Sequence, residues 1–169
     1  ATGLVLTFAT ADIESVIGSP MGNTITGNDR DNRFVLTTGN NSIATGSGLT
    51  TLKFVGNTFG TNTVTAPAAS DGIVLNLHQL PVPVHLNLHH PTQALGGGSL
   101  TFEGVGNNAV RSILGTVFGD TLVGNHSADA PGIDIYGGGG RDSLVGGSGN
   151  DRLVAGTPQI VLLDFDLYT

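Results

Sequence analysis

Apolar side chains recur at intervals of nine residues in the first part of the chain, and each follows a small polar residue by two positions. We interpret each nine-residue unit as a tight turn of six residues followed by a short strand, whose apolar side chain points inward. Two units make one coil, so the pattern predicts stacked coils around an apolar core. The asparagines among the polar residues are expected to stack as a ladder without metal. The apolar positions are Ile25, Phe34, Ile43 and Leu52, and the polar positions are Asn23, Asn32, Asn41 and Thr50.

A longer repeat divides the chain into two similar halves. Residues 13–28 return 97 positions later as residues 110–125, with six identities. The tripeptide Leu-Thr-Phe stands upstream of each copy, at 6–8 and at 100–102. We therefore predict an all-β fold, a parallel β-roll or β-helix solenoid built from two imperfectly duplicated halves.

Between the halves, apolar and polar residues alternate, which predicts strands with one buried face over residues 73–89. Pro81 and Pro83 mark a turn or a sheet edge there. The stretch 56–70 looks like a loop, and residues 96–99 (GGGS) like a hinge into the second half. The apolar residues of the alternating stretch are Leu75, Leu77, Val84, Leu86 and Leu88.

Two tandem units in the second half fit the pattern Gly-Gly-x-Gly-x-Asp-x-apolar-x at every specified position. They cover residues 137–145 (GGGGRDSLV) and 146–154 (GGSGNDRLV), with Asp142 and Asp151 in the sixth position. Upstream units keep Asp120 and Asp129 in the same position. The second half therefore retains carboxylates where the first half has asparagine or threonine.

These residue types suit a calcium site. Glycine accepts the positive φ of a tight turn, which costs other residues about 1–2 kcal/mol. Turn carbonyls and one aspartate from each of two stacked turns then form the all-oxygen ligand set that calcium prefers. Because successive turns lie on opposite sides, we expect Asp120 to pair with Asp142 and Asp129 with Asp151, giving about two sites. The alternative is that each aspartate only caps its own turn. Positive φ is expected at Gly137, Gly138, Gly140, Gly146, Gly147 and Gly149, and the candidate calcium residues are the four aspartates with Gly138, Gly140, Gly147 and Gly149.

Residues 115–154 resemble the RTX, or haemolysin-type calcium-binding, repeats of secreted bacterial proteins. The resemblance implies a parallel β-roll, secretion and folding driven by calcium. Asp142 and Asp151 match the motif fully and Asp120 in part, whereas the unit of Asp129 has Pro131 in the apolar position. More broadly, the duplicated pattern is similar to repeat segments of very large bacterial surface proteins.

The amino-acid composition limits which macromolecules the chain is expected to bind and how its fold can be stabilised. Glycine accounts for 27 of 169 residues, cysteine is absent, and 13 acidic residues against 6 basic ones give a net charge of −7. This charge disfavours nucleic acids and anionic membranes, and no apolar run approaches the roughly 20 residues of a membrane span. Without cysteine, repetition or calcium must stabilise a secreted fold. The chain begins at Ala1 without a leader, so we expect a removed signal peptide or a segment of a longer protein.

Histidines crowd into the middle of the chain. His78, His85 and His89 fall on the polar face of the alternating strands, with His90 next in sequence, so a zinc or copper site is one interpretation and a solvated polar face is the other. The carboxylates are explained by their turn positions, and no glycine-rich loop opens a helix. We therefore expect no enzymatic activity.

These observations predict an extracellular or cell-surface structural module with one domain over residues 1–169. It comprises degenerate asparagine repeats over 1–65, alternating strands and a loop over 66–99, and calcium repeats with a terminal strand over 100–169. The apolar, strand-like ends at 4–8 and 160–168 invite strand addition by another copy, which builds a filament head to tail. The alternatives are a calcium-dependent polysaccharide-binding module, or a folding and secretion module of a larger enzyme or adhesin.

Overall fold

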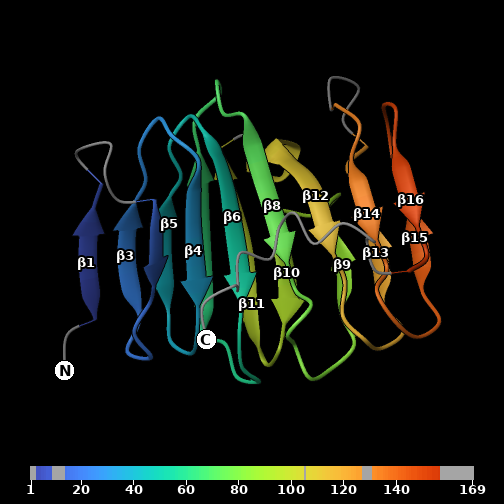
Figure 1. Ribbon diagram of the computed structural model, residues 1–169, viewed down its shortest axis with the longest axis horizontal. Helices are drawn as coiled ribbons and strands as arrows, with labels where there is room; N and C mark the ends of the chain where they lie inside the picture. Colours follow the sequence, from blue (N-terminus) through green and yellow to red (C-terminus); the bar gives the residue numbers. More distant parts are fainter. Residues whose placement is uncertain (1–2, 9–13, 105, 127–130, 157–169) are drawn as a thin grey trace.

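The computed structural model describes residues 3–8, 14–104, 106–126 and 131–156, and it is a parallel β-solenoid (Figure 1). One face is a seven-stranded parallel sheet that runs the length of the stack. In sequence order its strands are β2 (Ser15–Ile17), β4 (Asn32–Leu36), β6 (Leu49–Phe54), β8 (Gly72–Asn76), β12 (Val110–Leu114), β14 (Asp134–Tyr136) and β16 (Arg152–Val154).

The remaining strands form two shorter sheets. The six-stranded sheet has the order β1-β3-β5-β7-β11-β10, and the three-stranded sheet has the order β15-β13-β9. All pairs are parallel except that of β10 with β11. The strands are β1 (Leu4–Thr7), β3 (Asn23–Thr26), β5 (Asn41–Ala44), β7 (Thr61–Ala66), β9 (His85–Asn87), β10 (Thr92–Leu95), β11 (Gly98–Gly104), β13 (Thr121–Val123) and β15 (Ser143–Val145).

The nine-residue period explains how successive strands alternate between the sheets. Each unit supplies one short strand, and the turn after it carries the chain to the opposite face, so β3, β4, β5 and β6 alternate between faces. The predicted apolar residues stack in register, with Phe34 beside Leu52 and Ile25 beside Ile43. All four are at most 1 % exposed and belong to one continuous core. The predicted coil and its inward position are confirmed.

The duplication is also visible in the fold. Strands β1, β2 and β3 correspond to β11, β12 and β13, because β2 and β12 lie in the seven-stranded sheet and the others on the opposite face. The phenylalanine of each Leu-Thr-Phe tripeptide, Phe8 or Phe102, is buried. The two halves therefore repeat a structural unit as well as a sequence.

The middle of the chain differs from the expectation. Part of the predicted loop is strand β7, which pairs with β5 and β11. The predicted hinge is the tight turn of a hairpin, in which Gly96 (φ 53°) and Gly97 (φ 82°) join β10 to β11. Two consecutive residues at positive φ are what a two-residue hairpin turn requires. Strands β9 and β10 thus form an excursion, because β9 pairs with β13 and β10 with β11.

The five apolar residues predicted to be buried over 73–89 are at most 3 % exposed, but β8 is buried on both faces and not on one. Only one helix is present in the described ranges, the short 3-10 helix Gly106–Ala109. No helix there is long and apolar enough to cross a membrane.

Candidate calcium turns and polar ladders

The turn glycines adopt the backbone conformation that the motif requires. Gly138, Gly140, Gly147 and Gly149 have φ between 88° and 110°, as predicted. A Cβ at Gly138 would also lie 1.9 Å from the carbonyl oxygen of Thr116 in the stacked turn. Two tight constraints, a left-handed backbone and close contact with the next coil, therefore coincide in this turn.

The first glycine of each motif has a different role from the one predicted. Gly137 and Gly146 are not at positive φ. A Cβ at Gly137 would lie 2.2 Å from Oδ2 of Asp142, and one at Gly146 would lie 2.2 Å from Oδ2 of Asp151. These glycines leave room for the carboxylate of the same turn, which folds back over the turn's start.

One edge of the solenoid brings Asp120 and Asp142 together, as the predicted pairing requires. The amide of Asp120 donates a hydrogen bond of 2.9 Å to Oδ1 of Asp142. Asp120 in turn accepts hydrogen bonds from the amide of Val84 (2.8 Å) and from the amide and hydroxyl of Thr116 (2.6 and 3.0 Å). With 1 % exposure, the carboxylate of Asp120 is a buried cap for its own turn and for the preceding coil.

The carboxylate of Asp142 is not satisfied in the same way. Its Oδ2 is buried and has no hydrogen-bond partner among the described residues. Leaving such an acceptor unpaired costs roughly 1–3 kcal/mol, and more when it is charged. An ion with oxygen preference would remove this cost, so the donor chemistry of this turn fits calcium.

On the other edge, Asp151 accepts a hydrogen bond of 3.0 Å from the amide of Ile133. Its predicted partner, Asp129, lies outside the described residues. No group of three or more histidine, aspartate or glutamate side chains within the described ranges converges to hold a metal. A cation at either edge would therefore depend on main-chain carbonyls and water in addition to aspartate.

Asparagines form a ladder in the first half, with a different membership from the one predicted. Nδ2 of Asn23 donates to Oδ1 of Asn41 (2.5 Å), and Nδ2 of Asn41 donates to Oδ1 of Asn62 (2.6 Å). Asn62 continues the ladder to the carbonyl of Ser99 (3.2 Å). All three asparagines are at most 3 % exposed. This ladder takes the structural position that the aspartates hold in the second half.

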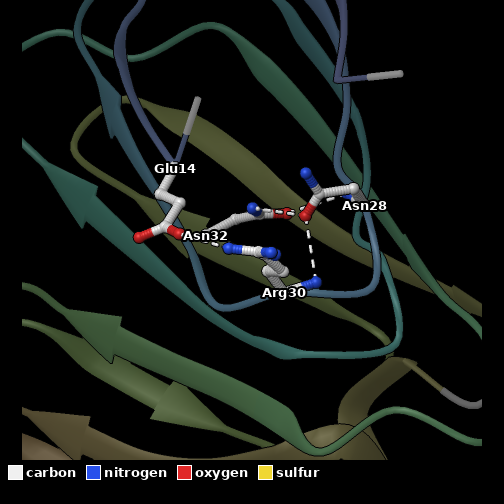
Figure 2. Close-up of polar contacts among 4 residues, drawn as sticks. All are labelled: Glu14, Asn28, Arg30 and Asn32. Carbon is white, nitrogen blue, oxygen red and sulfur yellow. Dashed lines mark hydrogen bonds and ion pairs between the residues drawn. The ribbon is translucent and has the colours of Figure 1, made fainter. Parts of the chain in front are cut away.

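Asn32 does not join this ladder because successive turns lie on opposite edges. It pairs with Asn28 in its own turn through two hydrogen bonds of 3.0 Å. Figure 2 shows this pair beside Arg30, whose amide donates to Oδ1 of Asn28 (3.0 Å) and whose guanidinium lies 3.6 Å from a carboxylate oxygen of Glu14. The turn is closed by its own side chains.

The histidines are arranged differently from the predicted group of three. The ring of His89 lies against that of His126, with ring centroids 3.8 Å apart, and no cluster of three such ligands occurs in the described ranges. Desolvation, followed by the charges of His126 and then His90, lowers the pKa of His89 below its usual value of 6.5. Sequence reasoning missed His126 because it lies 37 positions from His89 and has no local pattern.

Searches against protein-family models, curated proteins and solved structures found no match to this chain. The class of protein is therefore defined by its own geometry, which is a parallel β-solenoid with glycine turns and buried polar ladders at its edges.

Proposed function

We propose that this chain is an extracellular structural solenoid whose second half is braced by calcium. The observation that carries the proposal is the buried, unpaired Oδ2 of Asp142 in a turn with two glycines at positive φ. The first half satisfies the corresponding edge with an asparagine ladder, which needs no ion. The resemblance of residues 115–154 to RTX repeats supports the same assignment.

Asp120 and Asp142 would hold the ion on one edge, and Asp129 and Asp151 on the other. The turns of Gly138 and Gly140, and of Gly147 and Gly149, would supply main-chain carbonyls. Calcium contributes positive charge among carboxylates and carbonyl dipoles. Extracellular calcium-binding modules have dissociation constants of roughly 10⁻⁴ to 10⁻³ M. At millimolar calcium, a site of that kind would add only about 0.4–1.4 kcal/mol to the stability of the folded chain. No catalytic role is proposed.

Thermal unfolding with calcium or with EGTA tests the calcium brace. We expect calcium to raise the Tm of the unaltered chain, and Asp142→Asn to abolish most of that rise. Asp71→Asn is the matched control, because Asp71 is exposed and lies in the loop before β8. An equal Tm with calcium and EGTA, together with no heat of calcium binding by calorimetry, would refute the brace.

The first and last coils of the described part of the chain support head-to-tail assembly, whereas the predicted end strand over 160–168 lies outside the described residues. At the first coil, Val5 is 75 % and Ile17 68 % exposed, and at the last coil, Val145 is 44 % and Leu153 46 % exposed. Leu153 occupies the apolar position that is buried in the inner coils. Within the stack, each parallel strand pairs with the strand of the next coil, so the last coil of one copy has the edge that the first coil of another can continue. A head-to-tail contact whose rotation does not close into a ring builds an open filament.

Electron microscopy and light scattering in calcium test the assembly. We expect filaments from the unaltered chain, and shorter assemblies or monomers from Leu153→Asp. Val82→Asp is the control, because Val82 is similarly exposed (40 %) but lies in the loop before β9. Monomers at every protein concentration, or equal filaments from both variants, would contradict assembly through the last coil.

A groove on the six-stranded sheet favours a second candidate function, the binding of a neutral polysaccharide. Its volume is about 570 Å³, and its lining crosses β1, β3, β5 and β7. Register places Thr24, Ser42 and Thr63 side by side along it. None of the lining residues is charged, so hydroxyl and amide groups would meet the hydroxyl groups of a glycan.

Co-sedimentation with an insoluble neutral glycan such as cellulose, compared with anionic alginate, tests this candidate. We expect retention on cellulose alone, and its loss in Ser42→Lys. Thr26→Lys is the control, because Thr26 lies in β3, a strand that the groove crosses, but does not line the groove. Equal retention of the two variants would exclude the groove as the binding site.

A further inference from the structure

The paired histidines lie away from Asp120, Asp142 and the proposed filament ends, and His126 stands three residues before Asp129 in the same nine-residue unit. His89 follows β9 and His126 follows β13, and these strands pair in parallel register, with Asn87 opposite Val123. The pairing continues one residue past β9, because the amide of Leu88 donates to the carbonyl of Val123, the last residue of β13 (2.9 Å). Two successive coils thus bring these exposed imidazoles to a centroid distance of 3.8 Å, with their planes tilted by 48°.

The main chain on both sides of this pair is held in place. The amide of His89 donates to Oδ1 of Asn87 (3.0 Å), and the amide of Asn87 donates to the side chain of Gln93 (2.7 Å). Next to His126, the side chain of Asn125 donates to Asn108, and its carbonyl accepts from the amide of Ser148 (2.8 Å). The rings are therefore presented by a fixed frame and move by side-chain rotation.

Both rings are exposed, so their nitrogen atoms are accessible to a ligand. Neither ring makes a hydrogen bond to a residue in the described part of the chain. A neutral imidazole offers a lone pair, which is the form that binds transition metals.

We propose that His89 and His126 form a two-histidine site for a divalent transition metal such as Cu²⁺ or Zn²⁺. With metal–nitrogen distances of about 2.0–2.1 Å, two ligands at right angles, as in square-planar Cu²⁺, place their ring centroids about 4.4 Å apart, and the wider angle of tetrahedral Zn²⁺ places them farther apart. That separation exceeds the present centroid distance by about 0.6 Å, so a metal would require the two exposed side chains to rotate apart. Water fills the remaining positions, since the described residues provide no third ligand of this kind.

The metal would connect β9 to β13. Strand β9 belongs to the excursion between the halves, and β13 belongs to the coils with the candidate calcium turns. The site is chemically distinct from those turns, because calcium selects oxygen ligands and Cu²⁺ selects imidazole nitrogen. Binding to the folded state alone would stabilise the junction by mass action.

Calorimetry and electron paramagnetic resonance with Cu²⁺, in calcium-containing buffer, test this site in the full chain. Among divalent metals of the first transition row, Cu²⁺ is expected to bind most tightly. We expect one ion per chain with two imidazole nitrogens in the resonance spectrum. His89→Ala and His126→Ala should each weaken binding at least tenfold and remove one nitrogen.

His78→Ala and His85→Ala are matched controls that should leave the affinity and the spectrum unchanged. Circular dichroism checks that all four variants keep the β fold, as expected for exposed or half-buried side chains. The proposal is overturned if His89→Ala or His126→Ala binds Cu²⁺ as tightly as the unaltered chain. It is equally overturned if the controls lose as much affinity as the two site variants.

Discussion

Replacing Asn41 by alanine tests the asparagine ladder independently of any metal. Asn41 lies in the middle of the ladder and is 2 % exposed. Its removal leaves Oδ1 of Asn62 without its 2.6 Å donor inside the protein, at a cost of roughly 1–3 kcal/mol. Asn23 also loses one hydrogen bond, worth about 1 kcal/mol, although its Nδ2 keeps the carbonyl of Ser19 (2.9 Å). The expected loss of stability is about 2–4 kcal/mol.

Guanidinium unfolding followed by circular dichroism, with linear extrapolation to water, measures this loss. Ser42→Ala is the control, because Ser42 is the next residue in β5 but is exposed, and it should change stability by less than about 0.5 kcal/mol. Asn41→Leu distinguishes the loss of the hydrogen bonds from the cavity that Asn41→Ala creates. Leucine restores the side-chain volume but leaves the same groups of Asn23 and Asn62 unpaired. If Asn41→Leu is as stable as the unaltered chain, or if Asn41→Ala matches Ser42→Ala, the ladder does not stabilise the fold as argued.

Two further predictions concern the turns and the core. Gly138→Ala should destabilise the second half by about 2 kcal/mol or more, because Gly138 has a φ of 92° and its new Cβ would lie 1.9 Å from a carbonyl oxygen. Gly156→Ala is the control, because a Cβ there meets nothing within 4 Å and should shift the Tm very little. Equal Tm values for the two variants would contradict the stacked turn. Phe34→Ala should cost about 3–5 kcal/mol by denaturant unfolding, since Phe34 is fully buried and packs on Phe8 with ring centroids 5.6 Å apart. A loss below about 1 kcal/mol would mean that this coil is not closely packed.

The fold was largely predictable from the sequence, because the nine-residue spacing of apolar residues indicates which side chains face the core. Ile25, Phe34, Ile43 and Leu52 were placed in the core by spacing alone, and all are buried. The glycines at positive φ were predictable for a similar reason, since few other residues adopt that backbone conformation in a tight turn. The nine-residue spacing and the turn glycines are both local features, so they can be recognised in one sequence without knowledge of the tertiary contacts.

The misplaced features depend on contacts between distant residues. Strand β7 lacks an obvious period, yet its Asn62 meets Asn41 because the coils stack. Asn32 shares the spacing of Asn23 and Asn41 but lies on the other edge, where Asn28 satisfies it. His126 meets His89 through the pairing of β13 with β9.

The sequence by itself determined the coil, its apolar core and the two classes of turn, one with asparagine and one with aspartate. Repetition makes this possible, because each unit must bury the same side chain and bend at the same positions. Only the tertiary structure decided which polar groups are satisfied. Asp120 and Asp142 occupy the same motif position, but both oxygens of Asp120 accept hydrogen bonds, Oδ1 from Val84 in the stacked coil and Oδ2 from Thr116 in its own turn. Asp142 accepts one only at Oδ1, from the amide of Asp120 in the stacked coil. A hydrogen bond between coils depends on which turns meet at one edge, and that is set by the stacking of the entire chain.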